Sequence, residues 1–363
     1  MSFSYTTINN INELYTIKED WIALHAISDS PSIYNSYEFV SNSLFFLKHE
    51  HSTPFVLLVY QDSVLKGIFF MERNTEIKSK VKLQLIESTA QQEIDKPYPI
   101  IHTGCQAAMW AAFFDYLPQA GEWDVFRIYE LNENKKDLIL NQLSRKNTII
   151  RINPDKYGPT IDLKQSWQEY LMKHKKMRKK INRLIKSHGD SISFKVFDND
   201  LTALEVYKNI ESKSWKSGKI GIARNFNTYR FYQGMCQSLS DSETLSMKIG
   251  ILYIDNTPIS AEIAYICNKD VYFCHGCYND QYATYSPGMI STAYFIQSFM
   301  DENYHTGDFL CGYADYLKAW SDSTIKTQQI DIYNNTLSVK AFFFMRGIRK
   351  LLSYAFPRLA HDQ

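Results

Sequence analysis

The segment Tyr285-Ser286-Pro287-Gly288 carries the residues best suited to bind a phosphate group. It follows an apolar run that should be a strand and precedes an amphipathic run that should be a helix. A serine that can cap, a proline suited to the first helical turn and a glycine that lets a ligand approach the backbone occur together there. Because a helix start presents unpaired N–H groups and a positive dipole end, this segment predicts a site for a phosphate or pyrophosphate.

Polar residues around the strand expected after that helix could move a proton. They are Asp308, Asp315, Tyr316 and Lys318. An aspartate with a tyrosine could take a proton from an amine nucleophile or give one to a leaving thiolate. A capped turn and a surface ion pair are the alternative for each residue.

The run Cys274-His275-Gly276-Cys277 has the residue types of a metal or redox site but not the pattern. No second cysteine pair follows at ligand spacing, and a strand over 271–278 would send Cys274 and Cys277 to opposite faces. We therefore expect no metal. The same alternation places His275 on one face with Cys277 and Phe273, which favours a packed histidine, with a general base as the alternative.

The run of residues after Trp167 is strongly cationic. Its basic residues are Lys173, Lys175, Lys176, Arg178, Lys179, Lys180, Arg183 and Lys186. An apolar stripe can form on the same helix from Tyr170, Met177, Ile181 and Leu184. A solvated surface helix is the plain interpretation. The cationic face could instead hold the phosphates of a nucleotide carrier, a tRNA acceptor stem, or an anionic glycan or lipid.

Length and composition predict an ordinary cytoplasmic protein of two domains. With 363 residues the chain is longer than one hydrophobic core usually serves, and 45% of its residues are hydrophobic against 22% charged. No stretch is apolar enough to cross a membrane, and the N-terminus lacks the pattern of a secretion signal. The formal charge of +1 gives no large field for nucleic acid, and the six scattered cysteines suit a reducing compartment.

Several enzyme classes lack their sequence signatures here. There is no Gly-x-Ser-x-Gly turn for a serine hydrolase and no glycine-rich loop of the P-loop or Rossmann type. The sequence also lacks a histidine cluster for metal-dependent hydrolysis.

Hydrophobic periodicity predicts one order of elements in both halves of the chain: a helix pair, a three-strand meander, a helix and a strand. The expected elements of the first half are helices within 13–47, strands at 55–60, 64–73 and 80–88, helices at 107–117 and 135–145, and strands at 124–131 and 148–152. Those of the second half are helices at 202–215, 229–239 and 289–303, and strands at 244–253, 259–267, 271–278 and 308–310. A segment at 157–163 should join the domains, and Ser166 with Glu169 should cap the next helix.

Short motifs in this order resemble the CelD-like (cellulose-biosynthesis type) branch of the GNAT acyltransferase superfamily, which is akin to the FemABX aminoacyl transferases. They are Trp167 to Leu171 leading into the basic residues 178–183, Glu211 with Ser214-Trp215-Lys216, Ser286-Pro287-Gly288, and Asp308-Phe309 followed by Tyr316 and Lys318. The resemblance covers roughly residues 161–333. The sequence departs from the family at Leu310-Cys311-Gly312 and lacks the typical Arg/Gln-x-x-Gly-x-Gly phosphate loop.

The resemblance implies two GNAT-like domains in tandem, at 1–155 and 156–363, each a mixed, mostly antiparallel sheet flanked by helices. An acyl thioester from acyl-CoA would bind where central strands splay, and an amine of an amino sugar or surface-polysaccharide precursor would attack it directly, without a metal. Carried over by position, Asp308 and Tyr316 would lie near the reacting carbonyl as catalytic candidates, and His275 is a third candidate from the strand pattern. The candidates for binding acyl-CoA are Ser286, Gly288, Met289 and Arg178, and those for the acceptor are Trp215, Lys216, Tyr278 and Lys318.

The resemblance also leaves two other functions open. One is a FemABX-like transfer from aminoacyl-tRNA, which would use the basic helix 173–186. The other is a binding protein that keeps the fold without catalysis. For single residues there are plainer roles as well, since Trp215 could be core and Lys216 a favourable charge at a helix end.

The C-terminal run 339–355 combines apolar and basic residues. Its apolar members include Phe342, Phe343, Phe344, Ile348, Leu351 and Leu352, and they lie beside the basic residues Arg346, Arg349 and Lys350. Such a helix could lie on a membrane surface or a partner. We expect it to pack on the protein instead, because its apolar positions cover a wide face.

Overall fold

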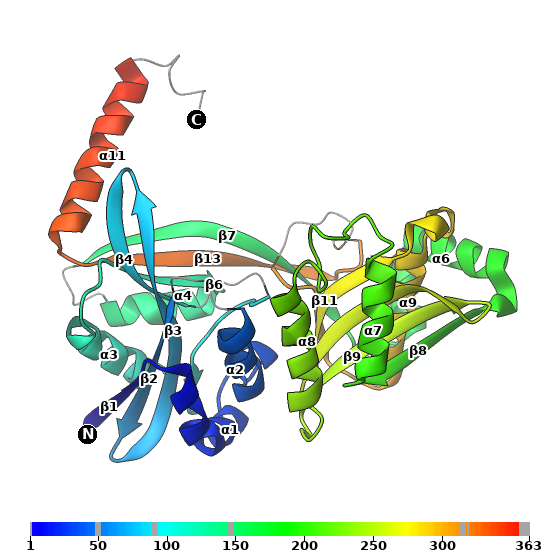
Figure 1. Cartoon of the computed structure of the whole chain (residues 1–363), viewed down its shortest axis with the longest axis horizontal. Helices are drawn as coiled ribbons and strands as arrows, with labels where there is room; N and C mark the ends of the chain where they lie inside the picture. Colours follow the sequence, from blue (N-terminus) through cyan, green and yellow to red (C-terminus); the bar gives the residue numbers. More distant parts are fainter. Residues whose placement is uncertain are drawn as a thin grey trace. The chain divides into compact units, whose positions relative to one another are not determined.

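The computed structural model describes residues 2–47, 52–88, 93–143, 148–311, 317 and 319–355. Its described residues form two compact units, one from 1–35, 48–155 and 327–363 and the other from 36–47 and 156–326. In each unit helices flank a mostly antiparallel sheet (Figure 1). The expected mixed α/β fold is confirmed. Among the described residues, no helix has both the length and the apolar character needed to cross a membrane.

The two units differ from a simple division of the chain after residue 155. Helix α2 (Tyr37–Phe46) belongs to the second unit because Phe39 contacts Phe231 of α8 (Phe226–Ser238) edge to face, with ring centroids 5.3 Å apart. Strand β13 (Ser323–Tyr333) ends in the first unit, where it pairs with β6 (Val125–Leu131). Chain order alone does not reveal such exchanges.

In the first unit, the sheet is built on the meander of β2 (Thr53–Gln61), β3 (Val64–Lys78) and β4 (Val81–Ser88). Strand β1 (Phe3–Ile8) extends it beside β2, the short β5 (Ile100–Ile101) pairs with β3, and β6 pairs in parallel with β4. The helices are α1 (Lys18–Ala26), α3 (Gln106–Tyr116), α4 (Glu133–Leu143) and α11 (Leu337–Ala355). Trp110 of α3, fully buried, meets Phe69 of β3 at the centre of the core.

In the second unit, the sheet runs in the order β7-β12-β11-β10-β9-β8. The strands are β7 (Ile149–Asp162), β8 (Ile192–Asp198), β9 (Leu245–Ile254), β10 (Thr257–Cys267), β11 (Asp270–Tyr278) and β12 (Thr306–Asp308). All pairs are antiparallel except β11 with β12. The helices besides α2 and α8 are α5 (Trp167–Lys173), α6 (Lys175–His188), α7 (Leu201–Glu211) and α9 (Pro287–Asp301).

Both units contain the expected order of helix pair, meander, helix and strand. In each, the last strand of the meander pairs in parallel with the strand that follows the helix, β4 with β6 and β11 with β12. The capping box at Ser166 is confirmed, since its hydroxyl accepts a bond from the Glu169 amide at 3.2 Å.

Four expectations about the elements were wrong. Strand β7, which the sequence placed only at 148–152, continues through residue 162 and so includes most of the segment expected to join the domains. Strands β1, β8 and β13 were not predicted, although apolar and polar residues alternate along parts of them. The basic run does not continue the helix that begins after Ser166, since His174 (φ −104°, ψ 57°) separates α5 from α6. Helix α7 ends at Glu211, four residues before the expected end.

Candidate active site

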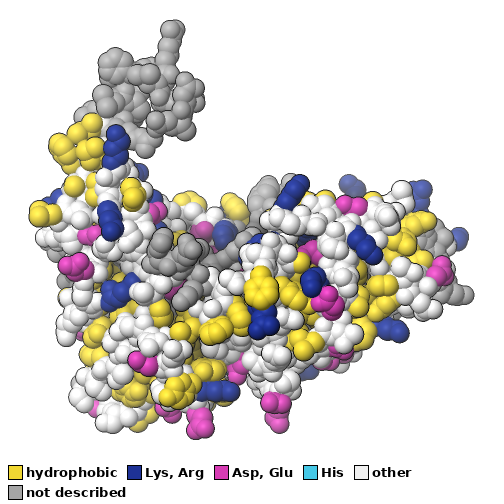
Figure 2. All heavy atoms as spheres, in the orientation of Figure 1, with side chains coloured by type: hydrophobic (Ala, Val, Ile, Leu, Met, Phe, Trp, Pro, Cys, Tyr) yellow, Lys and Arg dark blue, Asp and Glu magenta, His cyan; other side chains and the backbone are white. Residues whose placement is uncertain are grey.

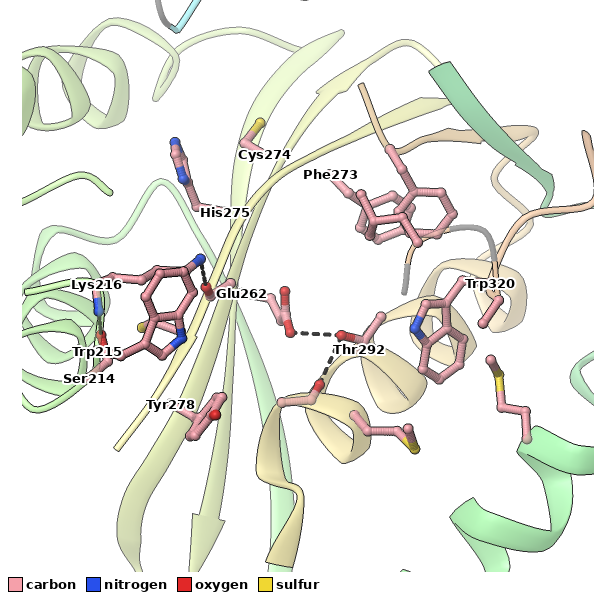
Figure 3. A pocket seen from close by; sticks show the side chains of 18 residues that line it. Ser214, Trp215, Lys216, Glu262, Phe273, Cys274, His275, Tyr278, Thr292 and Trp320 are labelled. Atoms are coloured by element: carbon pink, nitrogen blue, oxygen red, sulfur yellow. Dashed lines mark hydrogen bonds between the residues drawn. The ribbon is translucent and has the colours of Figure 1, made fainter. Parts of the chain in front are cut away.

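A cavity of about 480 Å³ lies in the second unit beside the open edge of strand β11 (Figure 3). Strands β11 and β12 pair only over Asp270–Tyr272 and Thr306–Asp308. Beyond Tyr272 no described strand pairs with this edge of β11. The walls come from β10, β11, the start of α9, the segment after α7, Met177 of α6 and the residues around Trp320. The separation of two neighbouring strands thus creates the space.

Glu262 of β10 is the only acidic side chain among the described residues that line the cavity. Its carboxylate accepts a hydrogen bond from the Thr292 hydroxyl of α9 at 2.9 Å (Figure 3). Burial raises the pKa of Glu262 from 4.5 to about 8, against the lowering effects of the Thr292 bond and the charge of Lys216. A carboxyl with this pKa can exchange protons near neutral pH, as a general base must.

Lys216 is held at the open edge of β11. Its ammonium group donates to the carbonyl oxygen of Gly276 at 2.6 Å. The Asn279 amide donates to the carbonyl oxygen of Ile259 on β10. Because backbone groups alternate between the two edges of a strand, those of Gly276 and Tyr278 face the open edge of β11. Backbone donors and acceptors, together with one cation, therefore face the cavity.

The segment after α7 positions Trp215 and Lys216. Glu211 at the end of α7 is buried, and its carboxylate accepts from the amides of Ile222 and Ala223 at 3.2 and 2.8 Å, which fixes the two ends of the segment. Trp215 is not core as the plain interpretation had it, because 56% of its surface is exposed at the cavity. Lys216 lies five residues beyond the helix and bonds to β11 instead of balancing the end of α7.

A β-bulge in β11 changes which residues face the helices on each side. Ile263 pairs with His275 and Ala264 with Phe273, so Cys274 is the extra residue. Phe273 packs on Phe299 of α9, with ring centroids 5.7 Å apart, whereas the His275 ring lies 5.6 Å from that of Tyr232 on α8. The expectation that His275 shares a face with Phe273 was therefore wrong. Figure 3 shows the His275 side chain directed away from Glu262.

The start of α9 lies in the cavity wall, but not as a serine-capped helix. Ser286 adopts the left-handed conformation (φ 51°, ψ 49°), and its side chain caps nothing. The amide of Ser286 donates to Ala283 and that of Met289 donates to the Ser286 carbonyl, both at 3.0 Å. The backbone amides of Ser286, Gly288 and Met289 were the candidates for binding phosphate. Of these, only the Gly288 amide donates to no backbone carbonyl among the described residues. Gly288 and Met289 line the cavity, and Ser286 does not.

The other predicted site residues lie elsewhere. Asp308 ends β12, and its carboxylate accepts from the Leu310 amide at 2.9 Å, so it caps a turn and is not in the cavity wall. Arg178 is half-buried on α6 beside Met177, and only Met177 reaches the cavity. Tyr316 and Lys318 lie outside the described residues. The structure thus brings together Trp215, Lys216, His275, Tyr278, Gly288 and Met289 around the cavity.

One end of the cavity is apolar. The rings of Phe273 and Phe309 are stacked with centroids 4.8 Å apart, and Trp320 is almost fully buried beside them. The Tyr170 hydroxyl fixes the backbone at this end of the cavity by donating to the Trp320 carbonyl oxygen at 2.7 Å. Figure 3 shows Thr292 and the Glu262 carboxylate between this end and the Lys216 end.

Sequence reasoning missed Glu262 and Thr292. The available signal was a single carboxylate in the apolar run Ile259 to Cys267, since an acid in such a strand must find a partner or remain protonated. Thr292 lies one helical turn after Gly288, on the same face of α9. Its hydroxyl oxygen is also 2.9 Å from the Gly288 carbonyl oxygen, so its one proton is shared between that carbonyl and the Glu262 carboxylate.

Residues 173–318, about two fifths of the chain, match the family model described as an acetyltransferase (GNAT) domain. The matched range includes Glu262, Lys216 and most of the cavity wall. The second unit therefore contains a region similar to a GNAT acetyltransferase domain. The finer assignment to the CelD-like branch stays a prediction. A comparison with curated proteins found no match.

Three solved structures have the same fold over nearly the whole chain. A conserved protein of unknown function from Bacteroides thetaiotaomicron is 11% identical, with a TM-score of 0.58 over 92% of this chain and 100% of its own. FemX is 9% identical, with a TM-score of 0.60 over 91% of this chain and 98% of its own. The C-terminal domain of a putative lysylphosphatidylglycerol synthetase from Agrobacterium fabrum is 10% identical, with a TM-score of 0.54 over 92% of this chain and 95% of its own. At these identities the likeness establishes the fold alone.

Proposed function

We propose that the cavity is the active site of an N-acyltransferase that moves an acyl group from acyl-CoA to an amine by direct attack. The observation that carries this proposal is the Glu262 carboxyl, whose pKa burial raises to about 8, beside an open strand edge in the GNAT-like region. An amine must lose a proton as it attacks, and a carboxylate of this pKa is a suitable acceptor. Asp308, bound to its own turn, is a weaker candidate for this role.

Separate residues have separate roles in the proposed acyl transfer. Acyl-CoA supplies an activated thioester, whose carbon–sulfur bond breaks as the carbon–nitrogen bond forms. Glu262 takes the proton of the attacking amine, and the leaving sulfur takes a proton for which Tyr316 is the candidate. Backbone groups at the open edge of β11 hold the two reactants together, which can supply several kcal/mol of the barrier.

The cavity fits an acyl donor in two respects. The apolar end at Phe273, Phe309 and Trp320 suits an acyl chain, and the start of α9 offers the Gly288 amide to a phosphate. A side chain at Gly288 would lie 3.3 Å from the Tyr278 ring, so glycine leaves the approach open. Arg178 is the candidate for a second phosphate contact. Trp215, Lys216, Tyr278 and Lys318 are the candidates for the acceptor, for which an amino sugar or surface-polysaccharide precursor is our choice.

Calorimetric titration with acetyl-CoA and longer acyl-CoAs tests the proposal on the wild type and on two variants. Gly288→Asp adds bulk and a negative charge where we place phosphate, whereas Gly288→Ala adds bulk alone. We expect binding by the wild type, weaker binding by Gly288→Ala and none by Gly288→Asp, with unchanged thermal unfolding of both. No binding by the wild type would remove the acyl-CoA proposal.

A second candidate function is transfer from aminoacyl-tRNA, which the cationic surface of α6 favours. The residues Lys175, Lys176, Lys179 and Arg183 are exposed there, and no ion pair of theirs occurs within the described part of the chain. Contacts of this kind would make binding strongly dependent on salt.

Neutralising Lys175, Lys176 and Lys179 together separates the two candidates. If the donor is acyl-CoA, its affinity should stay the same, because these side chains are exposed and do not line the cavity. If the donor is tRNA, binding should weaken and lose much of its salt dependence. A protein that binds either ligand without turnover would be the non-catalytic alternative.

A further inference from the structure

Helix α11 (Leu337–Ala355), at the C-terminal end of the first unit, has two faces with different environments. Its first turns pack on the unit through Val339, Phe342 and Phe343. Val339 and Phe342 are 3% exposed, and the Phe342 ring stacks on that of Tyr333 with centroids 6.0 Å apart. At 100° per residue these positions occupy one side of the helix. The sequence expectation that α11 packs on the protein therefore holds for this side.

The opposite side of α11 is apolar and exposed. Leu337, Ala341, Phe344 and Ile348 follow one another at spacings of four, three and four residues, which places them in one stripe about 180° from the packed side. Leu337 is 84% exposed and Phe344 is 68% exposed. Figure 2 shows hydrophobic and cationic side chains next to one another on the described turns of this helix. A stripe of this kind is rarely left in water without a purpose.

The charge of the helix distinguishes among possible occupants of the stripe. In sequence, the charged residues of α11 are Lys340, Arg346, Arg349 and Lys350, and no aspartate or glutamate occurs between Leu337 and Ala355. A second copy of α11 would share the 4-3-4 spacing of a coiled coil, but it would pack together two helices whose charges are all positive, with Lys340 beside the seam. An anionic surface complements both the stripe and the charge.

We propose that α11 docks on the surface of a bilayer that contains anionic lipids, with Leu337, Ala341, Phe344 and Ile348 in the interface. The helix lies in the plane of the membrane and does not cross it. Lys340, which is exposed, contacts lipid headgroups from one flank of the stripe, whereas Arg346 lies on the opposite side of the helix. This role uses no residue of the cavity and stands independently of the proposed acyl transfer.

Co-sedimentation of the full chain with vesicles tests the proposal. One vesicle type is phosphatidylcholine alone, and the other is equal parts of phosphatidylcholine and phosphatidylglycerol. We expect binding to the anionic vesicles that weakens with salt. The double variant Phe344→Asn, Ile348→Asn should bind at least about tenfold more weakly, because it removes two large apolar groups from the interface. Lys340→Gln should weaken binding roughly fivefold.

Matched controls exclude unfolding and non-specific binding. Phe226 of α8 is 76% exposed, so Phe226→Asn makes the same change on a surface outside α11 and should leave binding unchanged. Neutralising Lys175 and Lys179 on α6 tests whether that cationic helix binds the vesicles. The proposal is wrong if the Phe344 double variant binds like the wild type, or if only the α6 variant loses binding. It is also wrong if the wild type binds neither vesicle type and is a dimer that the double variant converts to a monomer.

Discussion

Replacing Glu262 with glutamine should remove a pH dependence from the folding stability of this protein. Burial raises the pKa of the Glu262 carboxyl from 4.5 to about 8, so the folded state holds this proton more tightly than the unfolded state. The stabilisation from that proton is complete below the unfolded pKa and is lost as the pH rises through the folded one. The interval spans about 3.5 pH units at about 1.4 kcal/mol each, so ionised Glu262 costs up to about 5 kcal/mol of folding stability.

Urea unfolding at pH 6 and pH 9 measures this effect. Over that range the free energy of unfolding of the wild type should fall by about 3 kcal/mol more than that of Glu262→Gln. Glutamine has nearly the same size and can still accept the bond from Thr292, so packing changes little. Glu243→Gln, which neutralises an exposed glutamate, is the control and should keep the wild-type pH slope. Equal slopes for the wild type and Glu262→Gln would refute the buried carboxyl and its proposed role as the base.

Three further substitutions test how the site is held. Lys216→Met removes a charge that lowers the pKa of Glu262, so the midpoint of the pH profile of kcat/KM should move upward; an unmoved midpoint would mean that Lys216 does not act on this carboxyl. Gly221→Ala would place a Cβ 2.1 Å from the Glu211 carboxylate at φ +99°, so thermal unfolding should show a loss of about 1–3 kcal/mol. Ser166→Ala should lose about 1 kcal/mol of stability by the same measurement, because it removes the helix cap.

The sequence predicted most of the elements because their hydrophobic patterns are regular. The meander strands β9, β10 and β11 and helix α9 appear within about two residues of their expected ends, since apolar residues recur regularly along each of them. The strands that it missed are half polar. In β8, Ile192, Phe194 and Val196 alternate with polar residues, which is the signal of a half-buried strand, but the run is short and only partly buried.

The candidate site was harder to predict because it depends on departures from regular geometry. The alternation rule placed His275 with Phe273, and one extra residue at Cys274 reversed that assignment. The cap rule gave Ser286 a hydrogen bond that its left-handed backbone does not allow. Lys216 and Trp215 were identified by resemblance, but their positions depend on a segment held by a buried Glu211, which no local pattern indicates.

The bulge at Cys274 explains why a carboxylate can occupy the middle of this sheet. After the bulge, Gly276 lies opposite Glu262 on β10, with its backbone at the open edge. Any Cβ at Gly276 would lie 2.4 Å from the Glu262 carboxylate, so the glycine provides the room in which that side chain sits beside Thr292. If the pairing continued regularly from Phe273, Cys274 would lie opposite Ile263 and His275 opposite Glu262, where the histidine would fill the space. The Glu262 carboxyl, whose pKa is raised, therefore faces the cavity because three features act together: the bulge, the glycine and the separation of β11 from β12.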